Sequence, residues 1–327
     1  MQGMERKVAE SYGLEIINLF PYKDTIMIVT SQSRKMLRKI PFSLERLRFI
    51  HGAKEHLAGN GFTDVDKYLC TLEGEPYFNF DNNYYTLVDF IDGRESNFDN
   101  DHDVRQAAIT LAELHSASRG YSVPEGAKVQ DELGKLPGYF SKRLEDIKKM
   151  KKQAKKGRGR FDQLFLEQVD YFFEIGESAV SELEKSSYAR LVESTREEGH
   201  FCHHDYTHHN IIMNEAGVAI INFDYCCFEL KVYDIANLIR RKMRKCDWDI
   251  SKTELIINSY SSVEPLSSEE LAVMKIILQF PQKFWRVINR YYNSRRSWSE
   301  RSFMIRLQEV VDEIGPHKEF LSKYGLL

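Results

Sequence analysis

The chain has 327 residues, of which 42% are hydrophobic and 29% are charged, with a formal net charge of −3. Its length predicts about two domains or lobes, and its composition is typical of a soluble globular protein and excludes a disordered one. The near-neutral charge argues against nucleic-acid binding over the whole surface, and no apolar run of about 18 residues could span a membrane. The N-terminus has neither an apolar core nor a small-residue cleavage site, so we expect no secretory signal.

The five cysteines are odd in number, two of them are adjacent, and no C-x-x-C spacing occurs. This pattern favours reduced thiols in a reducing compartment over a disulfide framework.

Residues 1–92 are predicted to form a β-rich lobe with one long helix. Runs of β-forming residues between turn residues predict strands, at 14–20, 25–31, 34–40, 65–72 and 84–91. Ser43, followed by apolar residues at helical spacing, predicts a helix over 43–62. The turn at Asp92-Gly93 then marks the joint between two lobes.

Residues 93–327 are predicted to form a larger, mainly helical lobe. Helical periodicity predicts helices at 104–118, 161–185, 233–245, 251–261, 268–280, 282–292 and 300–313. One β element interrupts them, because "NIIMNEAGVAIINFD" (210–224) contains two short apolar runs around the turn "NEAG". The predicted fold class is therefore α+β, with an architecture similar to that of protein kinases and small-molecule kinases.

The stretch "FCHHDYTHHN" (201–210) raises the question of a metal site. His203, His204, His208 and His209 could supply zinc ligands. Their spacing does not match a helical H-x-x-x-H pair, and no second cluster completes a ligand set at a familiar interval. A zinc site is therefore disfavoured.

The same stretch has the spacing of a phosphoryl-transfer loop. Kinase loops place an aspartate that accepts the substrate's proton five residues before an asparagine that holds magnesium. Asp205 and Asn210 have this spacing, and His203 stands two residues before the aspartate. A hydrogen-bonded turn is the alternative for this pair. In kinases, the second strand after such a loop delivers a metal-binding aspartate.

The run "HHDYTHHNIIMNEAGVAIINFDYCCFELKVYDIANLI" resembles the H-G-D-x-x-x-x-N…I-D-F-D…Y-D-L-A signature of the aminoglycoside phosphotransferase and choline kinase superfamily. Within it, "LRKIPFSLERLRFI", "YTLVDFIDGRE" and "LAELHSAS" make the chain most similar to the CotS-type spore coat protein family, as a CotI-like member. The resemblance spans about residues 10–320. It implies a bilobal protein kinase-like fold and makes the histidine richness incidental.

The resemblance also implies roles for individual residues. Asp205 matches the catalytic base, and Asn210 matches the first magnesium ligand. Asn222 stands where the family's main magnesium aspartate is expected, so a charge is missing. Asp224, two residues on, points to the same side if the strand continues, and could compensate in part.

The phosphate-binding features depart from the family as well. Arg38 stands where a lysine is expected, and Lys39 would face the other side of the strand. The helix glutamate that would pair with this base is not clear, since Glu45 is early and Glu55 is late. The loop "FPYKD" between the first two strands has no glycine.

Two functions follow from the resemblance. The first is a structural or assembly component of the spore coat, with a degraded or repurposed nucleotide site. Such a protein would be made in the cytoplasm of the sporulating cell, deposited in the spore coat, and partnered by other spore coat proteins. The second is a phosphotransferase that uses Mg and ATP or GTP to phosphorylate a hydroxyl of a small molecule, polysaccharide or coat protein. Without activity, no cofactor is expected.

Residues 148–160 hold eight Lys or Arg residues and no acid. A solvated helix and loop is the simpler interpretation, and a patch for an anionic partner is the alternative. No nucleic-acid-binding motif is present.

Overall fold

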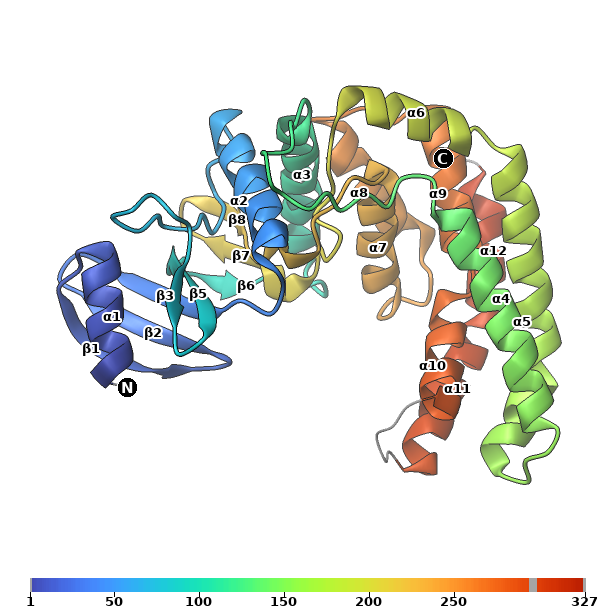
Figure 1. The fold of residues 1–327 in the computed structure, drawn as a ribbon. Helices are drawn as coiled ribbons and strands as arrows, with labels where there is room; N and C mark the ends of the chain where they lie inside the picture. The colour runs from blue at the N-terminus through green and yellow to red at the C-terminus, as the bar shows by residue number, and fades with distance from the viewer. Residues whose placement is uncertain (1, 294–298, 326–327) are drawn as a thin grey trace. The chain divides into compact units, whose positions relative to one another are not determined.

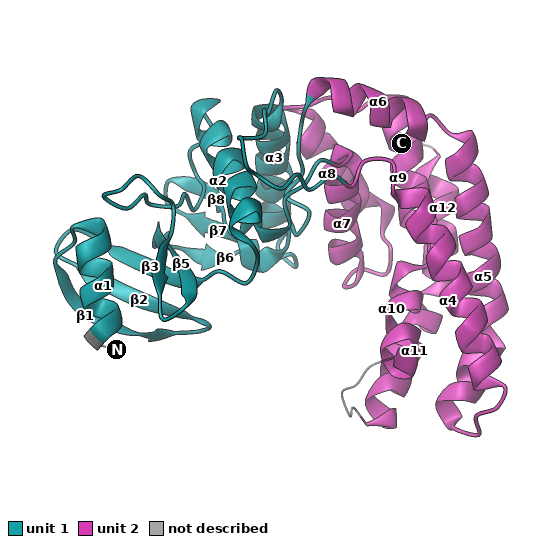
Figure 2. Ribbon diagram, viewed as in Figure 1, with its two compact units in different colours: residues 1–131, 199–228 teal, residues 132–198, 229–327 magenta. Residues whose placement is uncertain are grey.

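The computed structural model describes residues 2–293 and 299–325 (Figure 1). The chain divides into two compact units, the first formed by residues 1–131 and 199–228 and the second by residues 132–198 and 229–327 (Figure 2). The boundaries of these units lie at residues 131/132, 198/199 and 228/229. They do not test the lobe boundary predicted at residues 92 and 93, which stays a prediction. Every residue predicted for the site belongs to the first unit.

The first unit contains a five-stranded antiparallel sheet with the order β1-β2-β3-β5-β4. Its strands are β1 (Ile16–Tyr22), β2 (Thr25–Thr30), β3 (Arg34–Lys39), β4 (Phe78–Phe80) and β5 (Asn83–Asp89). Helix α1 (Gln2–Tyr12), which was not predicted, buries Met4 and Val8 in the same apolar core as Leu37 and Leu87. The buried and exposed positions alternate in β3, so Leu37 faces this core while Arg38 does not.

The strand predicted at 65–72 is wrong. This segment makes only isolated bridges, at Val65 and Tyr68. The carbonyl oxygen of Asp66 accepts a hydrogen bond from a lysine side chain of a helix, and the N–H of Leu69 donates to the carbonyl oxygen of Leu87, so the segment makes single contacts and no continuous ladder. The neighbour of β5 is β4 instead.

Two helices and a second, smaller sheet complete the first unit. Helix α2 (Leu44–Gly59) begins after Ser43, whose side chain accepts a hydrogen bond from the backbone N–H of Arg46, as predicted for an N-cap. Helix α3 (Asp101–Ser118) begins after Asn100, which caps it in the same way. The small sheet has the order β6-β7-β8, and its strands are β6 (Arg94–Glu95), β7 (Ile211–Asn214) and β8 (Gly217–Ile220).

The second unit is helical in its described residues, as predicted for most of this region. Its helices are α4 (Leu136–Ala154), α5 (Arg160–Lys185), α6 (Tyr188–Glu198), α7 (Lys231–Met243), α8 (Ile250–Ser261), α9 (Ser268–Gln279), α10 (Gln282–Asn293), α11 (Glu300–Asp312) and α12 (Ile314–Tyr324). Stacked aromatic pairs such as Phe140–Phe280 and Phe172–Phe284 join them. Helices α4, α6 and α12 were not predicted. No described helix combines the length and apolarity needed to cross a bilayer.

The basic segment 148–160 is the end of α4 and the turn into α5. Met150 and Ala154 are buried, and Lys151 forms an ion pair with Asp170 of α5. Most of the other lysines of the segment are exposed, which fits the solvated interpretation.

A buried ion pair joins α2 to the segment that follows it. The Lys54 side chain is 1% exposed, and its Nζ lies 2.8 Å from Oδ1 and 2.7 Å from the carbonyl oxygen of Asp66. The same ammonium lies 4.0 Å from the centre of the Tyr68 ring. Because a buried charge is stable only when it is paired, this contact fixes residues 66–68 against the helix.

Replacing Lys54 by alanine should lower the free energy of unfolding by about 3–5 kcal/mol, because Asp66 would lose its buried counter-ion. The matched control is Lys67→Ala, which removes an exposed ion pair with Glu55 and should cost about 1 kcal/mol or less. Urea denaturation measures both values. Equal losses in the two variants would show that Lys54 does not anchor the fold.

Candidate functional site

His203 holds the loop of residues 203–210 to the small sheet and is fully buried. Its Nε2 lies 3.0 Å from the carbonyl oxygen of Ile221, and its Nδ1 accepts a hydrogen bond of 3.2 Å from the backbone N–H of Asp205. The first contact requires a proton on Nε2 and the second requires a lone pair on Nδ1, which defines a neutral imidazole. His203 is thus a structural residue with both ring nitrogens engaged by the backbone.

Asp205 and Asn210 lie together, as the spacing predicts for a phosphoryl-transfer loop. The side-chain amide of Asn210 donates to the Asp205 carbonyl oxygen at 2.9 Å and to its carboxylate Oδ2 at 3.1 Å. The short 3₁₀-helix η1 (His208–Asn210) places Asn210 just before β7. Tyr206, which follows Asp205, anchors the loop to α3, because its hydroxyl donates a hydrogen bond to the Ala107 carbonyl oxygen.

The hairpin ends differently from the expectation. Strand β8 ends at Ile220, and the 3₁₀-helix η2 (Phe223–Tyr225) begins three residues later. Asn222 has φ 67° and ψ 62°, a left-handed conformation that asparagine tolerates better than most residues. Its backbone N–H donates to Oδ2 of Asp66 at 3.0 Å. The strand therefore does not continue to Asp224.

Asn222 and Asp224 are nevertheless brought together, by Arg38. One guanidinium nitrogen of Arg38 donates to Oδ1 of Asn222 at 2.8 Å and to Oδ1 of Asp224 at 3.0 Å, and the other pairs with Oδ2 of Asp224. The Asn222 amide in turn donates to Oδ1 of Asn210 at 3.3 Å. The three predicted metal ligands thus form one hydrogen-bonded group, with a guanidinium bound to two of them.

Helix α2 presents cations to this region, and neither of its two candidate glutamates, between which the sequence did not decide, pairs with Arg38. Glu45 is exposed in the first turn of the helix, and Glu55 forms a surface ion pair with Lys67. Arg46 instead donates to the backbone carbonyl oxygens of Asp224, at 2.8 Å, and Cys226, at 2.6 Å.

The contacts of Lys54, Asp66 and Arg46 were missed at the sequence level. Each of them joins segments distant in sequence, and no local spacing marks them. Lys39, the other predicted phosphate ligand, ends β3 and is exposed, one residue after Arg38.

Burial keeps two groups next to this site neutral. It raises the pKa of the Tyr68 hydroxyl well above its usual value, with further contributions from the charges of Asp66 and Asp224. Burial also raises the pKa of the Cys226 thiol to about 11. Neither group is suited to act as a base or nucleophile at neutral pH.

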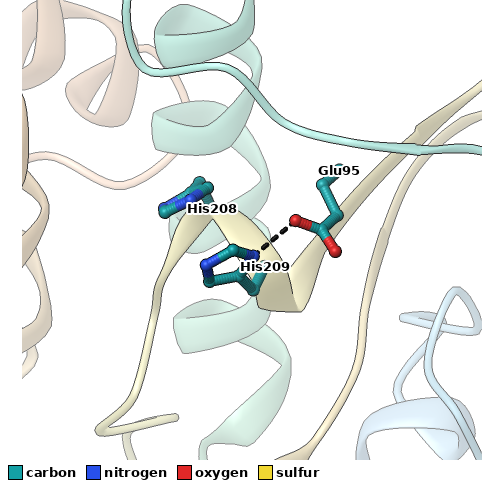
Figure 3. Close-up of side chains that lie close together, drawn as sticks. All are labelled: Glu95, His208 and His209. Atoms are coloured by element: carbon teal, nitrogen blue, oxygen red, sulfur yellow. Dashed lines mark hydrogen bonds and ion pairs between the residues drawn. The ribbon is translucent and has the colours of Figure 1, made fainter. Parts of the chain in front are cut away.

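A second polar group lies beside the loop, where the histidines gather. His209 Nδ1 contacts the Glu95 carboxylate, and His208 projects from the same turn (Figure 3). Lys23, at the β1–β2 turn, contacts the other Glu95 oxygen at 3.0 Å. Hydrogen bonds from His209 and then Lys23 lower the pKa of Glu95.

The residues present do not fit a magnesium ion of the kind that the kinase-like fold implies. Magnesium is usually held by one or two carboxylates together with phosphate oxygens. Here Asp224 supplies the carboxylate, and both its oxygens and Oδ1 of Asn222 accept hydrogen bonds from Arg38. A metal ion at these oxygens would have to displace the guanidinium.

The fold is shared with solved phosphotransferases. An aminoglycoside phosphotransferase from Alicyclobacillus acidocaldarius subsp. acidocaldarius DSM 446 superposes with a TM-score of 0.87 and 23% sequence identity, over 98% of this chain and 94% of that one. Spectinomycin phosphotransferase APH(9)-Ia, solved with ADP and spectinomycin, superposes with a TM-score of 0.67 and 13% identity, over 100% and 98% of the two chains. The predicted bilobal kinase-like α+β fold is confirmed.

The sequence comparisons agree with the family that was predicted. Spore coat protein S of Bacillus subtilis (strain 168) is 25% identical over 299 residues, which cover 90% of this chain and 85% of that protein. The family model described as "Spore coat putative kinase YutH" matches residues 5–324. The chain therefore belongs to this spore coat kinase-like family, within the aminoglycoside phosphotransferase fold.

Proposed function

We propose that this protein is a structural or assembly component of the spore coat whose kinase-like site no longer performs magnesium-dependent phosphoryl transfer. One observation carries the proposal: Arg38 is bound to both Asn222 and Asp224. In this proposal the protein is made in the cytoplasm of the sporulating cell, is deposited in the coat and contacts other coat proteins. Its assignment as a CotI-like member belongs to the same proposal.

The chemistry of phosphoryl transfer supports this assignment. Catalysis of the reaction depends on positioning and on neutralising the charge of the transferred group. The aspartate-to-asparagine difference at position 222 removes one negative charge from the expected metal site. Arg38 then neutralises Asp224, so the pair offers a divalent cation no net negative charge. Asp205 remains in place, but a base without the metal lacks its main electrostatic support.

An active phosphotransferase is the second candidate, and the preserved Asp205–Asn210 contact favours it. In this alternative Asp205 is the base, Asn210 and Asp224 hold Mg, and Arg38 or Lys39 contacts the phosphates of ATP or GTP. The acceptor would be a hydroxyl of a small molecule, polysaccharide or coat protein. Arg38 would first have to leave Asp224, exchanging the carboxylate for a phosphate.

The alternative interpretation of segment 148–160, a patch for an anionic partner, belongs to the proposal as well, and the exposed side chains of Lys152, Lys155 and Lys156 support it. An acidic coat protein is the proposed ligand class, because charge complementarity guides such encounters.

Asp205→Ala, introduced into the sporulating cell's own copy of the gene, should leave coat assembly unchanged, because the proposed role does not use the base. Electron microscopy and resistance of the spores to lysozyme measure the outcome. Asp205→Asn, which keeps the shape of the side chain, is the matched variant. A deletion strain establishes which coat defect the absence of the protein causes. The same defect in both Asp205 variants, with normal protein levels, would contradict the structural role and support catalysis.

Arg38 and Asp224 should be strongly coupled in a double-mutant cycle. Because the pair is bidentate and Asp224 is nearly buried, Arg38→Ala and Asp224→Asn should each destabilise the protein, and the double variant should show a coupling energy of about 1–3 kcal/mol. Urea denaturation without nucleotide or metal measures it. The exposed pair Lys67–Glu55 is the control, with an expected coupling below about 1 kcal/mol. A coupling energy for Arg38–Asp224 no larger than that of the control would contradict the ion pair on which the proposed function rests.

A further inference from the structure

We propose that Glu95, His208 and His209 form a binding site for a divalent transition-metal ion, of which zinc is the reference example. Their ligand atoms, one carboxylate oxygen and one ring nitrogen from each histidine, all lie within 4.8 Å of one another. His209 faces Glu95, and His208 lies beside it on the same turn (Figure 3). This site is separate from the predicted magnesium ligands and does not depend on the proposed coat function.

The backbone fixes the three residues at one place. Glu95 pairs with Ile212 in the small sheet, and the two histidines belong to η1, which leads directly into the same strand β7. Ser96 strengthens the junction, because its backbone N–H donates to Ile211 and its hydroxyl donates to the His208 carbonyl oxygen. The ligands therefore stand on hydrogen-bonded backbone, which lowers the entropic cost of bringing them together.

The Glu95 oxygen on the side of the cluster contacts another proposed ligand and, among the described residues, no fixed cation. Arg94, the adjacent cation, is held by both oxygens of Asp103, at 2.5 and 2.9 Å. Lys23 contacts only Oε1 of Glu95, while Oε2 faces His209. The ring of Phe98 lies edge-on 5.8 Å from His208 and supports that imidazole. A metal ion would replace the hydrogen bond between His209 and Glu95.

The donor set selects the class of metal. Two imidazoles and one carboxylate are typical of zinc and similar ions, whereas magnesium prefers oxygen ligands. In a tetrahedral zinc site with bonds of about 2.0–2.2 Å, neighbouring ligand atoms lie about 3.3 Å apart. The ligand atoms here lie within 4.8 Å of one another, and rotation of the partly exposed side chains can bring them to this shorter separation. Three protein ligands leave a fourth position for water or another donor.

The spacing of the histidines in the sequence could not reveal this ligand set. Adjacent histidines match no common zinc motif, and the third ligand lies more than a hundred residues earlier in the chain. His203, by contrast, has both ring nitrogens bonded to backbone, so it is not part of this site.

The test uses the full-length chain without a histidine tag, titrated with Co²⁺ and then with Zn²⁺. We expect one equivalent of Co²⁺ to produce the visible absorption of a low-symmetry protein site, and Zn²⁺ to displace it, while excess Mg²⁺ does not. Isothermal titration with Zn²⁺ gives the affinity. Glu95→Gln, His208→Asn and His209→Asn, tested separately, should each weaken binding more than about tenfold.

Two controls separate this site from other donors. His102→Asn changes a histidine that is 70% exposed and lies outside the cluster, and Cys70→Ser removes an exposed thiol. Both should leave the affinity unchanged. The proposal is overturned if the native chain binds no stoichiometric Co²⁺ or Zn²⁺. It is equally overturned if binding survives all three ligand substitutions or is lost in either control. Circular dichroism of each variant verifies the fold.

Discussion

The guanidinium of Arg38 is the interaction on which the candidate site depends. It reaches from β3 of the larger sheet to the end of the hairpin and binds the side chains of Asn222 and Asp224. In the proposed function, this guanidinium takes the place that a metal ion would have in a phosphotransferase. The cation cannot diffuse away, because it is covalently part of β3.

The surrounding charges are arranged consistently with that substitution. Helix α2 contributes two cations. Arg46 donates to the backbone carbonyl oxygens of Asp224 and Cys226. Lys54 contacts the carbonyl oxygen and the carboxylate of Asp66. The Asp66 carboxylate in turn accepts a hydrogen bond from the backbone N–H of Asn222. The left-handed conformation of Asn222 is thereby fixed from one side by Asp66 and from the other by Arg38. Protein groups on both sides therefore hold the end of the hairpin in place.

Local patterns predicted the fold and the loop well. Ser43 marked the start of α2, alternation along the predicted strand at 34–40 separated Arg38 from Lys39, and the spacing of Asp205 and Asn210 predicted that their side chains meet. These features depend on neighbours within a few residues, and the sequence contains them directly.

The other features of the fold and the site depend on contacts between distant residues, which local sequence patterns do not encode. Residues 65–72 have β-forming composition, yet they form only isolated bridges, and the buried Lys54 holds the carbonyl oxygen of Asp66. Strand β6 has only two residues, Arg94 and Glu95, too few for periodicity to reveal, and its position beside β7 brings Glu95 to His209. The partner of Arg38 could not be predicted either, since 186 residues separate it from Asp224. The family pattern implies a glutamate of α2 as the partner of Arg38, whereas the side chains that α2 directs to this region are those of Arg46 and Lys54.

The most direct test of the account is the magnesium dependence of nucleotide binding, measured by thermal shift with ATP and GTP. The native chain is compared with a variant that combines Arg38→Lys and Asn222→Asp, which frees the ligands and adds the missing charge. A ligand at 100 times its dissociation constant stabilises the folded state by about 2.7 kcal/mol, enough to raise the melting temperature by a few degrees. If Arg38 occupies the metal site, the native chain shows no magnesium-dependent rise and the variant shows one. A magnesium-dependent rise in the native chain would contradict this role of Arg38, because Arg38 would then have left Asp224 to a metal ion.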